Sequence, residues 1–194
     1  MKKIFLILSL LSFVSLIKAQ TATELIAKFP SLNLPLTIKG EALTPENVSK
    51  LESISYENML AHFKNAGGDL STGGSIYAYG QTKISDDKLI LLFATDESTE
   101  PKGKIQPMLN IYIAVYSLTE TKILTRKHLN TAAYLTFNSN ESKGKQVIDM
   151  ALDINNVWTL TVNDNTKSKP HPKPTVDVSK YKFTADYSDY ESSE

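Results

Sequence analysis

The most regular pattern in the chain begins at Ser75, where apolar and polar residues start to alternate with a period of two. This period is typical of β-strands, because successive side chains of a strand point to opposite faces of its sheet. Polar segments such as SDDK (85–88), TETK (119–122) and DINN (153–156) interrupt the alternation and predict turns. The pattern therefore predicts strands over 75–84, 89–95, 107–117, 123–129, 132–137, 146–152, 157–162 and 175–187.

One of these segments, 107–117, is apolar on both faces. Its two faces carry Leu109, Ile111, Ile113 and Val115 on one side, and Tyr112, Ala114 and Tyr116 on the other. A strand with two apolar faces is typical of a sheet that is covered on both sides. We therefore expect this strand inside a sheet, with one layer above it and one below it.

The N-terminal third has helical spacing instead. It predicts helices over 21–29, 43–51 and 54–68. Thr44 is the expected N-cap of the second helix, with Pro45 at the first helical position, and Ser55 is the expected N-cap of the third. Between the first two helices, segment 32–38 alternates strictly, and Pro35 confines this predicted strand to a sheet edge.

The C-terminal part begins with a change in composition. Residues 167–174 are rich in proline and lysine and predict an extended, solvated loop. The last predicted strand, 175–187, changes the phase of its alternation near Ser179 and Lys180, as a β-bulge would cause. The acidic tail, 188–194, is expected to fray.

Together these elements predict a mainly β protein with α+β character at the N-terminus. The expected architecture is an antiparallel meander that forms a sandwich or a partly closed barrel, with the short N-terminal helices packed on it. Residues 20–194 are about as many as one ordinary domain contains, so we expect a single domain.

The first 19 residues have the layout of a secretory signal peptide. Lys2 and Lys3 give a positive start, residues 4–17 form an apolar run broken by two serines, and Ala19 precedes the polar Gln20. A membrane-spanning helix needs about 20 apolar residues, more than this run provides. We expect cleavage after Ala19 and no membrane anchor afterwards, with an uncleaved anchor as the alternative. The bacterial character of the segment predicts export to the periplasm, the cell surface or the exterior.

Composition narrows the possible chemistry. The chain has no cysteine, which excludes disulfides, thiolate metal sites, cysteine nucleophiles and a lipid anchor on a cysteine. It has 21 basic and 21 acidic residues; loss of Lys2, Lys3 and Lys18 with the signal peptide leaves 18 against 21, a net charge of −3. A nucleic-acid partner would require a concentrated basic patch, so none is expected.

The titratable residues form no recognisable metal or catalytic motif. His62, His128 and His171 are the only histidines and lie far apart in the sequence, so no metal or cofactor is expected, and His128 is predicted on an exposed strand face. Asp149 and Asp153 are four residues apart, which is about 13 Å along a strand. The carboxylates of a glycosidase stand roughly 5 to 10 Å apart. We therefore assign Asp153 to the turn that follows it.

Three polar segments resemble ligand sites only in composition. Residues 65–74 are rich in glycine and hydroxyl groups but lack the lysine of a phosphate-binding loop. Segments 137–142 and 162–166 are rich in oxygen atoms but lack the ordered spacing of a calcium loop. No serine has the setting of a nucleophile elbow, and no catalytic residue is assigned. A non-enzymatic protein is the favoured prediction, and a hydrolase assembled from distant residues is the less favoured one.

The tyrosines of the predicted sheet are the candidate ligand-binding residues. Tyr77, Tyr79, Tyr112 and Tyr116 fall in its strands, as does Tyr134. Tyrosine rings on an open sheet face can stack on sugars or peptides while their hydroxyl groups form hydrogen bonds. The competing interpretation, which we favour, is that the N-terminal helices cover this face.

The layout resembles a group of known proteins. The signal peptide ending in KAQ, the segment LNLPLTI followed by a helix, and the strands NIYIAVYS and ILTRKHL resemble small exported β-rich proteins of unknown function from Gram-negative bacteria. The resemblance implies an exported β-rich domain and brings no catalytic residues. The predicted function is non-enzymatic binding of a protein, peptide or glycan. The alternative is a lipocalin-like carrier of an apolar small molecule, which requires a closed barrel.

Overall fold

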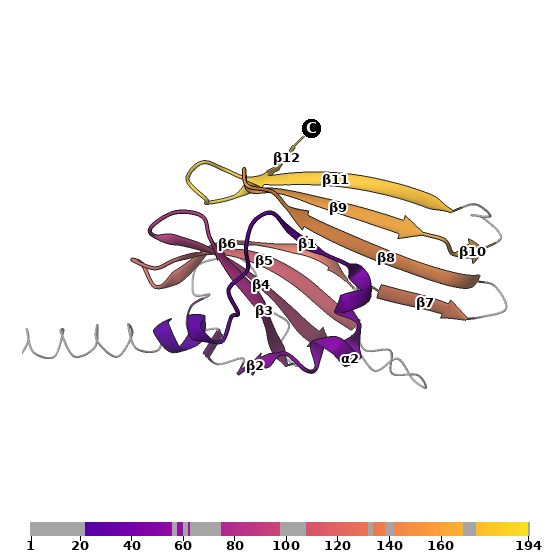
Figure 1. The fold of residues 1–194 in the computed structure, drawn as a ribbon, viewed down its shortest axis with the longest axis horizontal. Helices are drawn as coiled ribbons and strands as arrows, with labels where there is room; N and C mark the ends of the chain where they lie inside the picture. The colour runs from indigo at the N-terminus through magenta and orange to yellow at the C-terminus, as the bar shows by residue number, and fades with distance from the viewer. Residues whose placement is uncertain are drawn as a thin grey trace, which may run out of the picture.

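Two antiparallel β-sheets face each other, and a partly helical N-terminal layer covers one of them (Figure 1). The computed structural model describes residues 22–55, 58–59, 62, 75–97, 108–131, 134–138, 142–168 and 174–193. The predicted mainly β class is confirmed, and the sheets form a sandwich that is not closed into a barrel. The predicted signal peptide lies outside the described residues, and none of the described helices has the length and apolar character needed to span a membrane.

Sheet A is a meander of consecutive strands in the order β2-β3-β4-β5-β6. Its strands are β2 (Glu52–Ile54), β3 (Ile76–Lys83), β4 (Lys88–Glu97), β5 (Met108–Ser117) and β6 (Lys122–Thr131). The predicted hairpin over 75–95 is confirmed as β3 and β4. The predicted interior strand is β5, which pairs with β4 and β6.

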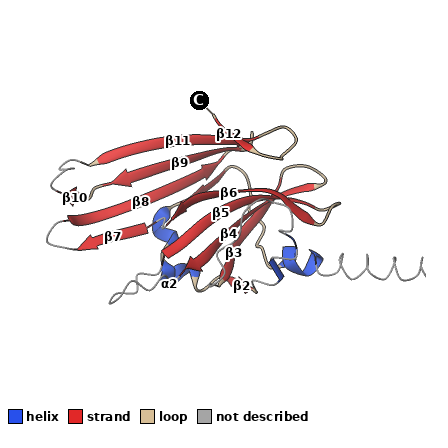
Figure 2. Ribbon diagram, turned by 180° about the vertical axis from the view of Figure 1, so that it is seen from behind, coloured by secondary structure: helices blue, strands red, loops and turns tan. Residues whose placement is uncertain are grey.

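Sheet B has the order β1-β8-β9-β11-β12, with β7 and β10 also paired to β8. Its strands are β1 (Leu36–Ile38), β7 (Tyr134–Asn138), β8 (Ser142–Leu152), β9 (Val157–Asp164), β10 (Lys167–Ser168), β11 (Thr175–Phe183) and β12 (Tyr190–Ser192). β1 and β7 follow each other along one edge of β8, and the 3-10 helix η1 (Gly40–Leu43) contacts both β7 and β8. Sheet B extends beyond sheet A at the end that carries β7 and β10 (Figures 1 and 2).

The strands of sheet A bury side chains on both faces. The inter-sheet core between the two sheets includes Ile38, Ile90, Leu92, Ile111, Ile113, Val115, Leu129, Met150, Leu152, Trp158, Leu160 and Phe183. The outer core, on the other face of sheet A, includes Ala22, Leu25, Phe29, Met59, Ile76, Ala78, Leu89, Leu91, Phe93, Ala114, Tyr116 and Ile123. The prediction that β5 is covered on both faces is therefore confirmed, because its alternate residues belong to different cores.

The first N-terminal helix, residues 22–27, packs on the outer face of sheet A (Figure 2). The Gln81 side chain of β3 donates hydrogen bonds to the carbonyl groups of Ile26 and Phe29, at 3.2 and 3.0 Å. The carbonyl groups at the end of a helix have no partner within the helix. Gln81 therefore supplies partners for them and fixes the helix to the sheet.

Both predicted helix caps are confirmed. The backbone N–H of Asn47 donates to the Thr44 hydroxyl at 3.4 Å, and the helix that follows is the single turn α2 (Pro45–Val48). The N–H of Asn58 donates to the Ser55 hydroxyl at 3.2 Å. Asn58, Met59 and His62 are helical, and the rest of this predicted helix lies outside the described residues.

Segment 32–38 does not form the single edge strand that its alternation predicts. Leu32 donates a backbone hydrogen bond to Gln81 in sheet A, whereas β1 begins only at Leu36 and pairs with β8 in sheet B. Pro35 has no N–H to donate to a ladder, and the chain changes sheets there. The part of the prediction that places the strand at an edge is confirmed for β1.

The predicted bulge in the last strand is wrong. β11 pairs with β9 in continuous register from Thr175 to Lys182. The apolar residues of this strand change phase because they lie on different faces. Val176 and Val178 point to the outer face of sheet B, whereas Tyr181 packs against the inter-sheet core. The first half of β11 lies where sheet B extends past sheet A, so it has no core to face.

The predicted fraying of the tail is also wrong, because Tyr190–Ser192 pair with β11 as β12. A turn held by Thr184 precedes β12: the N–H of Thr184 donates to the Asp189 carbonyl at 2.9 Å, and the N–H of Asp189 donates to the Thr184 hydroxyl at 3.1 Å. In the predicted loop over 167–174, Lys167 and Ser168 pair with β8 as β10, and residues 169–173 lie outside the described chain.

A bulge does occur in β3, where the register shifts between Ala78 and Gly80. A Cβ atom added at Gly80 would lie 2.5 Å from Leu32 Cγ, closer than real Cβ atoms approach a neighbour. Leu32 can pack on β3 only because Gly80 has no side chain. The bulge and the glycine together let the N-terminal segment lie against the sheet edge.

We predict that Gly80→Ala lowers the free energy of unfolding by about 1–3 kcal/mol, the usual cost of overpacking a filled site. The added methyl group would force Leu32 out of its position. Combining it with Leu32→Ala should recover part of the loss, because the two side chains then no longer overlap. Urea denaturation of both single variants and the double variant measures the coupling, and strictly additive effects would contradict the contact.

Candidate binding site on the outer face of sheet A

The four tyrosines predicted to bind a ligand do not share one surface. Tyr77 and Tyr79 of β3 are partly buried against the inter-sheet core. Tyr116 of β5 is 0% exposed in the outer core, under the N-terminal layer. Tyr112 lies on the same face of β5 as Tyr116 but keeps partial exposure. The favoured interpretation, that N-terminal segments cover this face, is therefore confirmed at Tyr116 and does not extend fully to Tyr112.

Tyr112 belongs to a row of three rings across neighbouring strands. Phe93 of β4, Tyr112 of β5 and His128 of β6 are paired in register. The Phe93 and Tyr112 rings are stacked, with centroids 5.3 Å apart and planes 15° apart, and the His128 ring follows at 5.0 Å and 36°. Phe93 is buried and His128 is exposed, as predicted. The row therefore runs from the outer core to the surface.

Two polar side chains fix the exposed end of this row. His128 Nε2 lies 3.1 Å from the side-chain oxygen of Asn110, which only accepts, so Nε2 carries the proton and donates. Asn110 is 4% exposed, so a buried amide holds the orientation of an exposed imidazole. The Arg126 guanidinium lies 5.6 Å from the Tyr112 ring centroid, within the range of a cation–π contact. We call Tyr112, Arg126 and His128 the ring platform.

A hollow of about 260 Å³ lies further along the same face. It is lined by Ala22, Thr23, Ile26, Tyr116, Leu118 and Thr121. The hollow is smaller than most pockets for small molecules, which measure about 300–1,000 Å³. It lies between the first helix and the turn that joins β5 to β6.

His62 and Tyr116 form a buried polar pair beside this hollow. His62 Nδ1 lies 3.0 Å from the Thr121 carbonyl, so this nitrogen carries the proton and donates to it. The Tyr116 hydroxyl lies 3.3 Å from the same nitrogen. Burial raises the pKa of Tyr116 to about 12, so the hydroxyl stays protonated at neutral pH. The pair joins the third helix to the β5–β6 turn, where Thr121 has a left-handed φ of 51°.

The aspartates considered as a carboxylate pair have separate structural roles. Asp149 binds Lys39 Nζ at 2.8 Å and accepts from the Gly40 N–H at 3.0 Å. Asp153 accepts from the N–H groups that follow it in the β8–β9 turn, at 2.8 and 2.9 Å. The predicted turn role of Asp153 is therefore confirmed, and Asp149 holds the start of η1 against β8.

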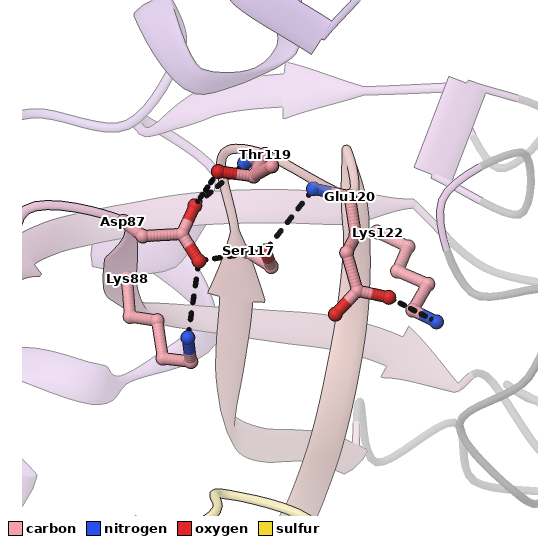
Figure 3. A network of polar contacts seen from close by, with 6 residues as sticks. All are labelled: Asp87, Lys88, Ser117, Thr119, Glu120 and Lys122. Atoms are coloured by element: carbon pink, nitrogen blue, oxygen red, sulfur yellow. Dashed lines mark hydrogen bonds and ion pairs between the residues drawn. The ribbon is translucent and has the colours of Figure 1, made fainter.

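Asp87, in the turn between β3 and β4, accepts hydrogen bonds from three residues (Figure 3). It accepts from the Thr119 N–H at 2.7 Å and the Thr119 hydroxyl, from the Ser117 hydroxyl at 3.2 Å, and from Lys88 Nζ at 3.0 Å. The Thr119 hydroxyl, followed by Lys88, lowers the pKa of Asp87 well below its ordinary value. These contacts tie the β3–β4 turn to the β5–β6 turn.

Several predicted features lie outside the described residues, among them His171 and the glycine-rich segment 65–74. Within the described part of the chain, no group of three or more histidine, aspartate or glutamate side chains could hold a metal ion. No family model, curated protein or solved structure matches this chain.

The ring platform was not predicted as a unit. Arg126 and His128 are two residues apart on a predicted strand, which places them on one face, and this signal was available from the sequence. Their position beside Tyr112 depends on the register of β6 against β5. That register shifts at two places, between Ile111 and Tyr112 and between Val115 and Tyr116, and the alternation does not reveal it.

We predict that Asp87→Asn lowers the melting temperature at pH 7, because the amide accepts these hydrogen bonds less strongly and loses the charge. An aspartate with a lowered pKa stabilises the fold above its unfolded pKa of about 3.9, and this contribution fades as the pH falls towards the folded pKa. The difference between wild type and variant should therefore be full at pH 5–7 and shrink below about pH 4.

Glu120→Gln is the matched control for this comparison. Glu120 pairs with Lys122 at 2.6 Å in the same region, but both side chains are exposed, and pairs of this kind contribute little. Thermal unfolding from pH 7 to pH 2 distinguishes the two variants. A pH-independent loss in Asp87→Asn, or an equal loss in Glu120→Gln, would contradict the assigned role of the carboxylate.

Proposed function

We propose that the protein is an exported, non-enzymatic binding protein that recognises a partner through the ring platform of Tyr112, Arg126 and His128. The observation that carries the proposal is the row of three packed rings that ends in an exposed, oriented His128. The resemblance of the layout to small exported β-rich proteins of Gram-negative bacteria supports the export part of this proposal. The partner is a glycan, a peptide or a protein of the periplasm or cell surface.

The chemistry of the platform supports this class of ligand. Because the rings of the row pack on one another, the exposed ring is that of His128 at its end, and a sugar or an aromatic side chain can contact it there. Burial of Phe93 and the hydrogen bond that His128 donates to Asn110 hold the rings in place, so little entropy is lost on binding. Arg126 adds a planar donor group that suits hydroxyl and carboxylate groups. No nucleophile and activating base are assigned here, and the proposed role is recognition.

The open sandwich does not favour the alternative function, a lipocalin-like carrier. A carrier of this type encloses its ligand in a closed barrel. The sheets of this protein form an open sandwich, and buried side chains such as Trp158, Met150 and Leu92 fill the space between them. The outer face of sheet A is therefore the better candidate for a binding surface.

The first test is a thermal-shift screen of the protein beginning at Gln20 against neutral and acidic oligosaccharides and peptide pools, since a ligand of the folded state raises the melting temperature. For the class that binds, we predict that Tyr112→Ala weakens binding about tenfold, equivalent to about 1.4 kcal/mol. Tyr112→Phe should stay within about twofold of wild type, because it keeps the stacking ring. Isothermal titration calorimetry measures both affinities.

Tyr77→Phe, on the other face of sheet A, is the control variant and should leave the affinity unchanged. The proposal fails if Tyr112→Ala and His128→Ala retain the wild-type melting temperature and bind with unchanged affinity.

Export is tested separately by expressing the full chain in a Gram-negative host and sequencing the N-terminus of the mature form. Gln20 at the N-terminus of a periplasmic product is expected, and an intact leader in the membrane fraction would favour the uncleaved anchor.

A further inference from the structure

Lys127 joins the two sheets on the side of the sandwich where β6 faces β11 and β12. Its ammonium nitrogen lies 3.8 Å from the ring centroid of Tyr181 and 3.8 Å from that of Tyr190. Lys127 belongs to the edge strand of sheet A, Tyr181 to β11 and Tyr190 to β12. The cation therefore lies between two rings of sheet B, at close cation–π distance from both.

This contact lies over the inter-sheet core. A hollow of about 10 Å³, the size of one water molecule, is lined by Lys127, Tyr181 and Tyr190 at the surface and by Ile113, Leu129, Trp158 and Phe183 below. Trp158 is 2% exposed, and its indole N–H has no hydrogen-bond partner among the described residues. Removing the cover would expose this part of the core to solvent.

β12 and the turn before it, which cover this hollow, have few other contacts with sheet A. β12 has three residues, all exposed, and it pairs only with the end of β11 among the described strands. The turn before β12 reaches sheet A a second time, where Lys88 Nζ lies 5.8 Å from the Tyr187 ring centroid, near the limit of a cation–π contact. The partly buried Tyr187 side chain of this turn also packs against the inter-sheet core. Short strands at a chain terminus open more easily than the core of a sheet. The close contact of Lys127 is therefore the main described attachment of β12 to sheet A.

We propose that residues 184–192 form a flap and that the Lys127 cation, clamped between Tyr181 and Tyr190, is the latch that keeps it closed over Trp158. Opening the flap gives access to the inter-sheet core without separating the sheets elsewhere. On the opposite side of the sandwich, η1 and α2 insert Leu43 and Val48 into the same core, and that side has no equivalent latch among the described residues.

Two opposing effects act on the pKa of Lys127, as expected for a latch that can open. Burial lowers the pKa of Lys127, and the Asp189 carboxylate in the turn before β12 acts in the opposite direction. The flap thus carries one ring, that of Tyr190, and the Asp189 carboxylate, and both favour the cation; Tyr181 of β11 supplies the second ring. Lys182, which also lines the hollow, carries a like charge that does not.

Trp158 is the only tryptophan in the chain, so its fluorescence reports on this site alone. The variants are Lys127→Met, which keeps an apolar stem without the charge, and Lys127→Arg, which keeps the charge. We expect faster acrylamide quenching of Trp158 and roughly three- to tenfold faster amide hydrogen exchange over 190–192 in Lys127→Met, the change expected for one lost cation–π contact. Lys127→Arg should stay close to wild type in both measurements.

Amides of 157–162, in the interior strand β9, provide the internal control and should keep their protection in every variant. Tyr190→Leu serves as a second variant, because it removes one ring of the clamp and leaves Lys127 in place; it should open the flap as Lys127→Met does. Wild-type exchange and quenching in both Lys127→Met and Tyr190→Leu would overturn the proposal. So would equal acceleration over 157–162 and 190–192, because the variants would then loosen the whole sandwich.

Discussion

Burial of sheet A on both faces is the constraint on which the rest of the structure depends. The alternate residues of β4 and β5 are apolar in both phases, so neither face of these strands can remain in water. Sheet B covers one face, and the N-terminal segments cover most of the other. A single pair of sheets could not bury both sets of side chains, and for this reason the N-terminal helices are part of the fold rather than an addition to it.

The third layer decides which residues of sheet A can meet a partner. Helix 22–27, held by Gln81, and the segment that carries Met59 and His62 bury the end of the outer face where Tyr116 lies. Towards β6 this cover ends, and the row from Phe93 to His128 reaches the surface. The ring platform therefore lies at the edge of the buried part of the outer face of sheet A. This position explains how its rings can be fixed from below and still be accessible at one end.

The open sandwich must also be closed along its sides. On one side the chain crosses from β1 to β2 and places η1 and α2 beside the core. On the other side polar and aromatic groups close the gap: the clamp around Lys127 joins β6 to β11 and β12. Exposing the apolar side chains of η1 and α2 to water is costly. The Lys127 cation, in contrast, is hydrated when it leaves the two rings, and this hydration offsets the lost contacts. The two sides therefore differ in how readily they can open.

The sequence by itself determined the class of the fold, the hairpins and the two-sided burial of β5. These features depend on local chemistry: the period of the alternation, the turn residues at Asp153 and the caps at Thr44 and Ser55. It also placed His128 on an exposed strand face. Tertiary structure decided where the chain changes sheets at Pro35, why β11 turns its valines outward, and which tyrosines are buried. Only the pairing register, with its shifts between β5 and β6, brings Tyr112 beside His128, and only the packing of the two sheets brings Lys127 beside Tyr181. Register depends on the geometry of the turn and on the packing of the folded sheets, and the local alternation, which is the same for many registers, does not specify it.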